Sequence, residues 1–525
     1  MSGKSEKSGK TGKLGKSAEP ALELAVAFEP TELDPGFPGL IEDVSGADWV
    51  PLFQNPCSFD PATFSKVMLN LIHNPNLNSS WLFRADILFK SDGDQDQPHG
   101  PAEHKPRLVQ FRDFQLEKLF VRRLIPRNAL RDKPLDQTCI FYHAEGPGEA
   151  ERWMLVYNPH VSSVSEMPFY HPNVRGLAFL HEWNAKTEEG TISIHYCFFN
   201  QDDRSQTPKL VRTALHLLST LHKHGEGSKA GYVKRVHHDT IVPQRTVQTT
   251  YARLKEKYGR KLIESWAEVT DPSKHVFEDL SIAAFLIELW RQMYSGTVFP
   301  GFVDIGCGNG LLVYVLLQEG YSGWGFDARK RKSWENYNVP SGTTINTEAL
   351  SSLRQHVLLP SIIQDRSKSD ETGDDLSNDY DMENLIQDGT FPKGTFIISN
   401  HADELTPWTP VLATASECPF IMIPCCSHDL SGSRFRAPPP KQQDKSTSAY
   451  SSLVSWVSQI GTDCGWEIET EMLRIPSTRN TGLLGRRRTA DYADVDLQEV
   501  IRKYGGAVGF ADNVMKLVKA NPRGH

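Results

Sequence analysis

The sequence lacks any run of 18 or more apolar residues, which excludes a candidate for a transmembrane helix. Its start, MSGKSEKSGKTGKLGK, lacks the apolar segment that a secretory signal needs. Cysteine is scarce, and eight cysteines without paired spacing exclude a disulfide scaffold and favour a reducing, intracellular compartment. Positive charge is not in excess either, because the net charge is −8. A protein that coats nucleic acid over its whole surface would be basic, so any nucleic-acid contact must come from a local patch.

The 525 residues are enough for two or three domains, and 39% hydrophobic and 23% charged residues are typical of a globular protein. Residues 1–20 consist mainly of Lys, Ser and Gly and cannot bury a core, so we expect a disordered basic tail. This tail is either a solvated extension or a loose arm that attracts phosphates.

Residues 21–230 are expected to form an accessory α+β region. Three aromatic and β-branched segments, 153–161, 176–183 and 191–199, are typical of strands. Residues 208–225 have the pattern of a helix that ends at Gly225. No catalytic signature is present in this half of the chain.

From residue 231 to about 510, apolar strands alternate with helices, which predicts an α/β domain with a doubly wound parallel sheet. The expected strands are short apolar segments, and the expected helices include residues 271–294 and a helix that opens at 329–337. Two polar stretches, 364–379 and 437–448, are too polar to pack, and we expect them to be mobile insertions.

The strongest motif is FVDIGCGNG at 302–310, a strand that runs into a glycine turn and then a helix. Glycines let the backbone approach a ligand closely, and a helix N-terminus offers free N–H groups. The acid Asp304, inside the strand, would repel a pyrophosphate but suits an ammonium or sulfonium group. Asp327 ends the next strand, where an acid can accept the hydroxyls of a ribose. The pattern therefore favours S-adenosylmethionine over NAD, although an ordinary glycine turn is the alternative.

A second motif, FIISNHADELTPW at 396–408, is an apolar strand that ends in polar residues. Because ligands bind at the carboxyl ends of strands in open α/β sheets, Asn400, His401, Asp403 and Glu404 are expected beside the cofactor. The alternative is a helix N-terminus whose first turn contains acids favoured by the helix dipole.

Three further segments contain possible metal ligands or nucleophiles. The His and Asp residues of 234–239 and 271–279 do not have the spacing of a known zinc motif, so packing or a substrate-facing loop is the better interpretation. In CCSHD at 425–429, adjacent cysteines are poor zinc ligands and the remaining ligands are missing. Ser427, His428 and Asp429 cannot form a hydrolase triad by adjacency alone. We expect no metal site.

Three basic clusters lie in the second half of the chain: Arg329–Lys332, then Arg434 with Arg436, and Arg486–Arg488, the last two in expected loops. Basic clusters are commonly solvated surface. Three of them in one acidic chain suggest instead a patch that follows nucleic-acid phosphates.

The chain resembles the fungal tRNA (uracil-2′-O-)-methyltransferase family that modifies uridine 44 of serine tRNA. The resemblance covers about residues 230–490, with weaker likeness in PNVRGLAFLHEW at 172–183. The tracts VTDPSKHVFEDLSIAAFL and NHADELTPW are more specific than the glycine motif, which many methyltransferases share. The resemblance implies a class I methyltransferase fold, S-adenosyl-L-methionine as methyl donor, a ribose 2′-hydroxyl of tRNA as acceptor, and a cytoplasmic setting.

Residue roles follow from the resemblance and from the mechanism of methyl transfer. The cofactor is expected to bind Asp304, Gly306, Gly308, Gly310, Asp327 and Asn400. Asp403 or Glu404 is the expected base or orienting group, with His401 as the alternative base. The Lys-Asp-Lys-Glu tetrad of other ribose methyltransferases is not evident, so the base stays open among these three. The residues expected at tRNA phosphates are Arg329, Lys330, Arg434 and Arg436.

Two other function classes remain at this point. A protein methyltransferase would share the cofactor motif but would not need basic clusters. A non-catalytic tRNA- or protein-binding scaffold would be free to lose the glycines that this chain keeps. An NAD-dependent oxidoreductase is disfavoured by Asp304.

Overall fold

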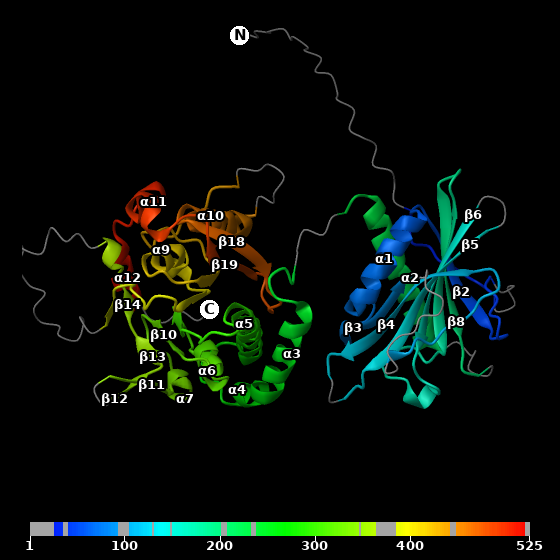
Figure 1. The fold of residues 1–525 in the computed structure, drawn as a ribbon, viewed down its shortest axis with the longest axis horizontal. Helices are drawn as coiled ribbons and strands as arrows, with labels where there is room; N and C mark the ends of the chain where they lie inside the picture. The colour runs from blue at the N-terminus through cyan, green and yellow to red at the C-terminus, as the bar shows by residue number, and fades with distance from the viewer. Residues whose placement is uncertain are drawn as a thin grey trace, which may run out of the picture. The chain divides into compact units, whose positions relative to one another are not determined.

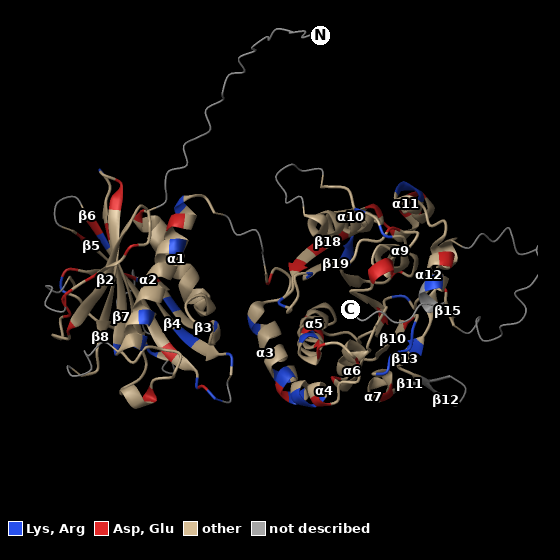
Figure 2. Cartoon of the chain, turned by 180° about the vertical axis from the view of Figure 1, so that it is seen from behind, with Lys and Arg blue, Asp and Glu red and all other residues tan. Residues whose placement is uncertain are grey.

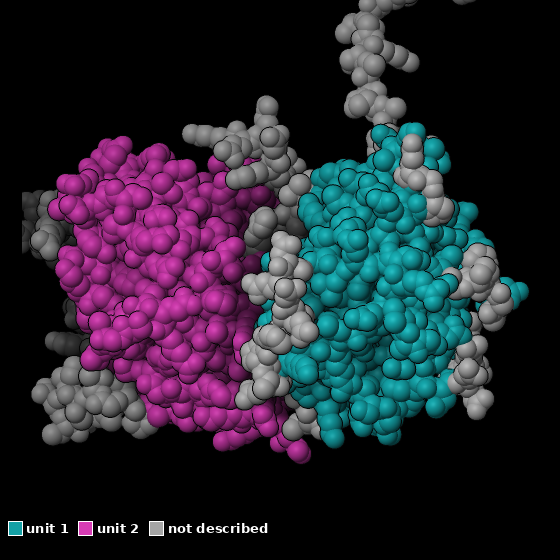
Figure 3. All heavy atoms as spheres, turned by 45° about the vertical axis from the view of Figure 1, so that its right-hand side comes forward, with its two compact units in different colours: residues 1–234 teal, residues 235–525 magenta. Residues whose placement is uncertain are grey.

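The computed structural model describes residues 26–34, 40–92, 104–128, 131–146, 150–200, 207–232, 238–345, 348–363, 385–440 and 448–519. The chain divides into two compact units, residues 1–234 and 235–525 (Figure 3). The expected tail at 1–20, the polar stretch 364–379 and most of 437–448 lie outside the described residues. Within the described ranges, no helix combines the length and hydrophobicity that a membrane crossing requires.

Unit 1 is an antiparallel sheet of eight strands with two main helices (Figure 1). The strand order is β1-β2-β8-β7-β6-β5-β4-β3. The strands are β1 (Thr31–Glu32), β2 (Trp49–Cys57), β3 (Leu82–Asp92), β4 (Gln115–Pro126), β5 (Leu135–Glu145), β6 (Ala150–Pro159), β7 (Gly176–Asn184) and β8 (Glu189–Cys197). The helices are α1 (Pro61–His73) and α2 (Pro208–Lys229), with 3-10 turns η1 (Pro75–Leu77) and η3 (Val164–Glu166).

Both faces of this sheet are buried. On β5, Cys139 and Phe141 belong to the core that includes α1 and α2, whereas Ile140 and Tyr142 belong to a second core on the other face. Successive side chains of a strand point to opposite faces, so a sheet covered on both sides gives apolar runs without alternation. This explains why the predicted strands of this half were conspicuous in the sequence.

The prediction that the helix at 208–225 ends at Gly225 is wrong, because α2 continues to Lys229. A Cβ added to Gly225 would lie 2.3 Å from Cε1 of Phe59. The glycine therefore allows the helix to approach the Phe59 ring and does not terminate it.

Unit 2 contains a seven-stranded sheet with the order β13-β10-β9-β16-β17-β19-β18. Its first five strands are parallel, and β19 runs antiparallel to both β17 and β18. The strands are β9 (Phe302–Ile305), β10 (Gly323–Asp327), β13 (Leu353–Gln355), β16 (Phe396–Asn400), β17 (Phe420–Ile423), β18 (Trp466–Met472) and β19 (Thr481–Arg488). Two small sheets pair β11 (Pro340–Ile345) with β12 (Glu348–Ser351) and β14 (Val357–Leu358) with β15 (Ile386–Gln387).

Helices cover both faces of the seven-stranded sheet. One core contains side chains of α3–α6, and the other contains side chains of α9–α12. The helical elements are α3 (Gln244–Leu254), the π-helix η5 (Lys255–Gly259), α4 (Arg260–Glu264), α5 (Pro272–Met293), α6 (Leu311–Gln318), α7 (Trp334–Tyr337), η6 (Ser361–Ile363), η8 (Asp403–Leu405), α9 (Thr409–Ala415), α10 (Ala449–Asp463), η9 (Tyr492–Asp494), α11 (Leu497–Lys503) and α12 (Phe510–Lys519). The predicted helix at 329–337 shrinks to the short α7.

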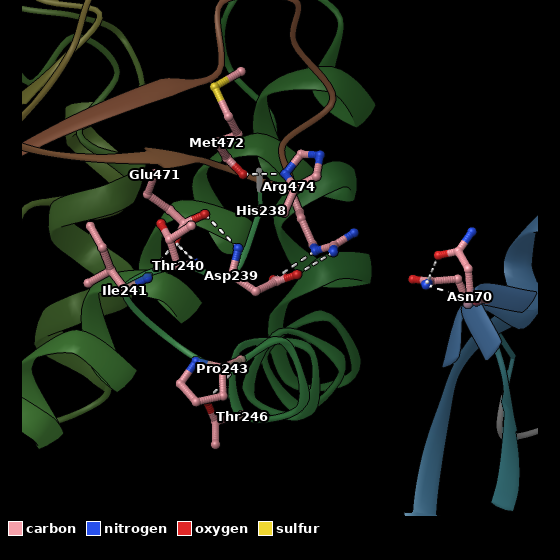
Figure 4. Close-up of polar contacts among 11 residues, drawn as sticks. Asn70, His238, Asp239, Thr240, Ile241, Pro243, Thr246, Glu471, Met472 and Arg474 are labelled. Carbon is pink, nitrogen blue, oxygen red and sulfur yellow. Dashed lines mark hydrogen bonds and ion pairs between the residues drawn. The ribbon is translucent and has the colours of Figure 1, made fainter. Parts of the chain in front are cut away.

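The buried carboxylate of Glu471 on β18 fixes the segment that leads into α3 (Figure 4). Its oxygens accept backbone N–H groups from Asp239 at 2.7 Å, Thr240 at 2.8 Å and Ile241 at 2.9 Å. Arg474 adds an ion pair to Asp239. His238 and Asp239 thus both bond to the segment at 471–474, while residues 234–237 of the predicted segment lie outside the described residues.

Glu471→Gln should destabilise unit 2 by about 1.5–3 kcal/mol, because an amide replaces the charged acceptor of three hydrogen bonds. Urea unfolding of the full chain measures this change. Glu467→Gln on the same strand is the matched control, since its half-exposed pair with Arg487 contributes at most about 1 kcal/mol. Equal effects of the two substitutions would contradict the anchoring role of Glu471.

Candidate active site

The site lies where the strand order of the parallel sheet reverses, between β9 and β16. Strands β10 and β13 continue from β9 in one direction, and β17 continues from β16 in the other. In open α/β sheets, ligands bind outside the carboxyl ends of the strands at this switch point. The glycine turn follows β9, and the segment 401–408 follows β16, so the structure brings the two predicted motifs to one place.

The glycine turn has three positive φ angles: 71° at Gly306, 51° at Gly308 and 78° at Gly310. A Cβ at Gly310 would lie 2.5 Å from the Leu353 side chain, and one at Gly306 would lie 3.1 Å from Cβ of Ala402. A Cβ at Gly308 would meet nothing within 4 Å. Packing therefore requires the first and last glycines, whereas the middle one borders open space that a ligand can occupy.

Asp304 is a fully buried carboxyl beneath this turn. Burial and the negative charges of Asp279 and Asp327 raise its pKa well above the ordinary value. Its Oδ1 atom has no hydrogen-bond partner among the described residues. A buried acceptor of this kind is costly unless a donor or a positive charge reaches it.

Asp279 on α5, which was not predicted as a site residue, lies close enough to Asp304 to interact with it electrostatically. Asn400 donates its amide to Asp279 at 3.4 Å, and its own Oδ1 atom is buried without a partner among the described residues. Burial and the charge of Glu278 raise the pKa of Asp279 to about 8. The available signal was the position of this acid within the apolar periodicity of the helix.

Glu278, also unassigned from the sequence, pairs with His401. His401 Nε2 lies 3.2 Å from a carboxylate oxygen of Glu278. Although burial raises the pKa of Glu278, the hydrogen bond and charge of His401 hold it below the ordinary value. Positive φ angles of 52° at His401 and 44° at Asp403 mark a strained turn, a feature that clusters at functional sites.

Asp327 lies at the end of β10, as expected, and also supports the glycine turn. Its carboxylate accepts the N–H of Gly308 at 3.1 Å and the N–H of Arg329 at 3.0 Å. Glu404 lies close enough to Asp327 to interact with its carboxylate electrostatically. Burial and the carboxylates of Asp403 and Asp327 raise its pKa to about 7, while Arg329 acts in the opposite direction.

Asp403 faces the cysteines that follow β17. The Cys425 thiol donates to Asp403 at 3.0 Å. Contact with the Cys426 thiol, burial and the charge of Asp403 raise the pKa of Cys425. All eight cysteines of the chain are unpaired in this structure.

The three basic clusters differ in how exposed their side chains are and in whether those side chains already pair with other groups. Arg434 and Arg436 are exposed after β17, and Lys330 is exposed after β10. Basic segments are visible near β10 and β13 (Figure 2). The third cluster lies in β19, not in the loop that the sequence suggested, and its guanidinium groups are engaged: Arg486 and Arg487 pair with Glu469 and Glu467, and Arg488 lies against Trp466 and Tyr492. These pairings make this cluster a weaker candidate for phosphate contacts than Arg434 and Arg436.

Residues 241–351 match the family described as "Predicted AdoMet-dependent methyltransferase". Residues 27–235 match the family described as "TRM44-like, N-terminal bet v1-like domain". The chain is thus an S-adenosylmethionine-dependent methyltransferase with an N-terminal bet v1-like domain. Ara h 8.0201, a solved structure, aligns with 36% of the chain at 10% identity and a TM-score of 0.20, too low for a fold assignment.

Similar proteins identify the family within the S-adenosylmethionine-dependent methyltransferases. The tRNA (uracil-O(2)-)-methyltransferase of Neurospora crassa is 55% identical over 90% of this chain and 93% of its own length. The proteins of the same name from Schizosaccharomyces pombe and Saccharomyces cerevisiae are 38% and 36% identical, each over 92% of this chain and 95% of their own length. The chain belongs to the tRNA (uracil-O(2)-)-methyltransferase family, which confirms the family predicted from its motifs.

Proposed function

We propose that the protein transfers a methyl group from S-adenosylmethionine to the ribose 2′-oxygen of a uridine in tRNA, at position 44 of serine tRNA, in the cytoplasm. The observation that carries this proposal is the pair of buried carboxyls, Asp304 and Asp279, beside a glycine turn at the switch point of the sheet. The relatives are tRNA (uracil-O(2)-)-methyltransferases, which supplies the substrate class and the uracil target.

We also propose a class I methyltransferase fold for unit 2. The support is the order of the sheet, in which three parallel strands run outward on one side of the switch point and two on the other, followed by the antiparallel β19. Residues 231–510 would be the catalytic domain, and residues 21–230 the accessory region.

The residues at the switch point fit the proposed cofactor. The unpartnered oxygen of Asp304, with Asp279 and Asn400 beside it, can accept the ammonium group of the methionine moiety. The open space at Gly308 admits the ligand against the backbone, with Gly306 and Gly310 shaping the turn. Asp327 retains lone pairs for the ribose hydroxyls, and Glu404 lies next to it.

When bound, S-adenosylmethionine supplies a methyl group activated by its sulfonium. The chain's part is to hold the 2′-oxygen roughly 3 Å from the methyl carbon, in line with the sulfur, and to accept the hydroxyl proton. Of the candidate bases Asp403, Glu404 and His401, we favour His401. The tautomer that donates Nε2–H to Glu278 has the basic lone pair on Nδ1.

Gly308→Ala and Gly310→Ala should separate ligand binding from stability. Alanine at 310 adds an overlap with Leu353 to the strain of a positive φ angle, so it should destabilise unit 2 by about 2–5 kcal/mol. Alanine at 308 meets no protein atom, so it should cost only the backbone strain of about 1–2 kcal/mol while blocking the cofactor. Thermal unfolding and calorimetric titration with S-adenosylmethionine measure both effects. Normal cofactor binding by Gly308→Ala would show that the open space serves another purpose.

Neutralising Arg434 and Arg436 together should weaken tRNA binding and reduce the slope of log K against log salt concentration by about 1–2, because each phosphate contact contributes roughly 0.7–0.9. Filter binding at several salt concentrations measures the slope. Arg487→Ala is the control, since this arginine already pairs with Glu467 and Glu469. An unchanged slope in the double variant would show that neither arginine contacts tRNA phosphates. Arg329 and Lys330 would then remain as candidates.

The decisive experiment incubates the full chain with radiolabelled S-adenosylmethionine and tRNA from cells that lack this activity. Nucleoside analysis should place the label in 2′-O-methyluridine, and sequencing of the labelled tRNA should give serine tRNA, position 44. Absence of label in tRNA, with the cofactor still bound in calorimetry, would contradict the proposal and favour a protein substrate or a missing partner.

A further inference from the structure

Asp403, Cys425 and Cys426 gather at the ends of two neighbouring parallel strands. Asp403 follows β16 and the cysteines follow β17, and the paired residues Asn400 and Ile423 end these strands side by side. One carboxylate oxygen and the two sulfurs all lie within 4.8 Å of one another. Sequence spacing could not show this group, because the carboxylate comes from a segment 22 residues before the first cysteine.

The chemistry of these three groups points to a metal of intermediate softness. Zinc binds thiolate sulfur at roughly 2.3 Å and carboxylate oxygen at roughly 2.0–2.2 Å, so tetrahedral ligand atoms lie roughly 3.5–3.8 Å apart. The atoms here lie within 4.8 Å of one another, so zinc binding requires side-chain rotations that shorten these separations by up to about 1 Å. Hard cations such as magnesium and calcium prefer sites made of oxygen alone.

The sequence alone predicts no metal site here, because it shows the adjacent cysteines but cannot place Asp403 beside them. We propose instead that Asp403, Cys425 and Cys426 form a zinc site next to the catalytic centre. Binding displaces the two thiol protons, including the one that Cys425 donates to Asp403, and each thiolate forms one bond to the metal. Three protein ligands leave a fourth position, which is typical of zinc sites that also bind water or substrate. His428 follows closely in sequence, and its buried Nδ1 atom has no partner within the described residues.

Such a site changes the role of Asp403. A carboxylate that ligates zinc is a poor proton acceptor, so Asp403 would be a metal ligand and not the base. His401, oriented by Glu278, would then accept the proton of the acceptor hydroxyl. This consequence rests on the proposed function, whereas the zinc site itself does not.

The test measures metal content and does not depend on methyl transfer. Untagged full-length protein, purified without chelator, is analysed by plasma mass spectrometry, and we expect about one zinc ion per chain. Replacement by Co²⁺ should give the intense near-ultraviolet band of thiolate-to-cobalt charge transfer. The Cys425→Ser/Cys426→Ser variant should lose at least about tenfold in zinc content and lose the band, and Asp403→Asn should lower zinc retention during dialysis.

Cys418→Ser is the matched control. Its thiol donates to the backbone carbonyls of Pro392 and Ser416, and serine can make the same hydrogen bonds. Retention of zinc by this control, together with S-adenosylmethionine binding by the double variant, would show that loss of zinc is not loss of folding. The proposal is overturned if the wild-type chain takes up neither zinc nor Co²⁺, if the double variant retains them, or if mass spectrometry shows Cys425 and Cys426 joined in a disulfide.

Discussion

Asp327→Ala is expected to weaken S-adenosylmethionine binding by about 100-fold. The substitution would remove the two charged hydrogen bonds that we propose between Asp327 and the ribose. Each would contribute about 1.5 kcal/mol, and tenfold in affinity corresponds to about 1.4 kcal/mol. The carboxylate also holds the N–H groups of Gly308 and Arg329, so its removal loosens the turn that shapes the cofactor site. Isothermal titration calorimetry of the full chain measures the change.

Asp327→Asn provides the graded control. An asparagine keeps one acceptor oxygen and the shape of the side chain, so its affinity should fall between those of the wild type and Asp327→Ala. Unchanged affinity in both variants would place the ribose elsewhere, and Glu404 would be the next candidate because it lies near Asp327.

His401→Ala should lower turnover by about 10²–10⁴-fold, the range contributed by a positioned general base. Cofactor affinity should be nearly unchanged, since His401 contacts Glu278 and not the carboxyls beneath the glycine turn. Glu278→Gln should have a smaller effect, because the amide still accepts the hydrogen bond but does not stabilise a protonated ring. Single-turnover kinetics with excess enzyme measures the chemical step.

Asp403→Ala is the comparison for this prediction. It should lower turnover while cofactor binding is kept. If it abolishes cofactor binding instead, Asp403 belongs to the cofactor site. If His401→Ala proves as active as wild type, the base is not His401, and Asp403 and Glu404 remain.

The central strands of unit 2 could be predicted from the sequence because they are largely buried between two layers of helices. The strands β9, β10, β16 and β17 are short apolar runs that end in glycine or polar residues, and this pattern is distinctive. The strands β18 and β19 were not anticipated, because WEIETEM and TGLLGRRR carry many charges. Those charges pair across the hairpin, as between Arg486 and Glu469, and a pattern of hydrophobicity cannot show such pairing.

The sequence could predict candidate site residues only where they lie in a predicted strand or directly after one. Asp304 lies in β9, Asp327 ends β10 and His401 follows β16, and the strand order brings them together. Glu278 and Asp279 reach the site from the side of α5, more than 100 residues before the strand end that they contact. The apolar periodicity of α5 marks Asp279 as an inward-facing acid. That the two acids meet the end of β16 depends on how α5 packs on the sheet, and this tertiary property cannot be predicted from local sequence.

The anchoring of residues 239–241 by Glu471 has a practical consequence for anyone who wishes to produce the methyltransferase half alone. A fragment that begins at residue 242, shortly before α3, would keep the buried carboxylate of Glu471 but lack the three backbone N–H groups that donate to it. A fragment that begins at residue 238 would retain them, with the Arg474 pair intact. Residues 238–241 contain no catalytic group, yet we expect the fragment that keeps them to be soluble and the fragment that lacks them to precipitate during expression.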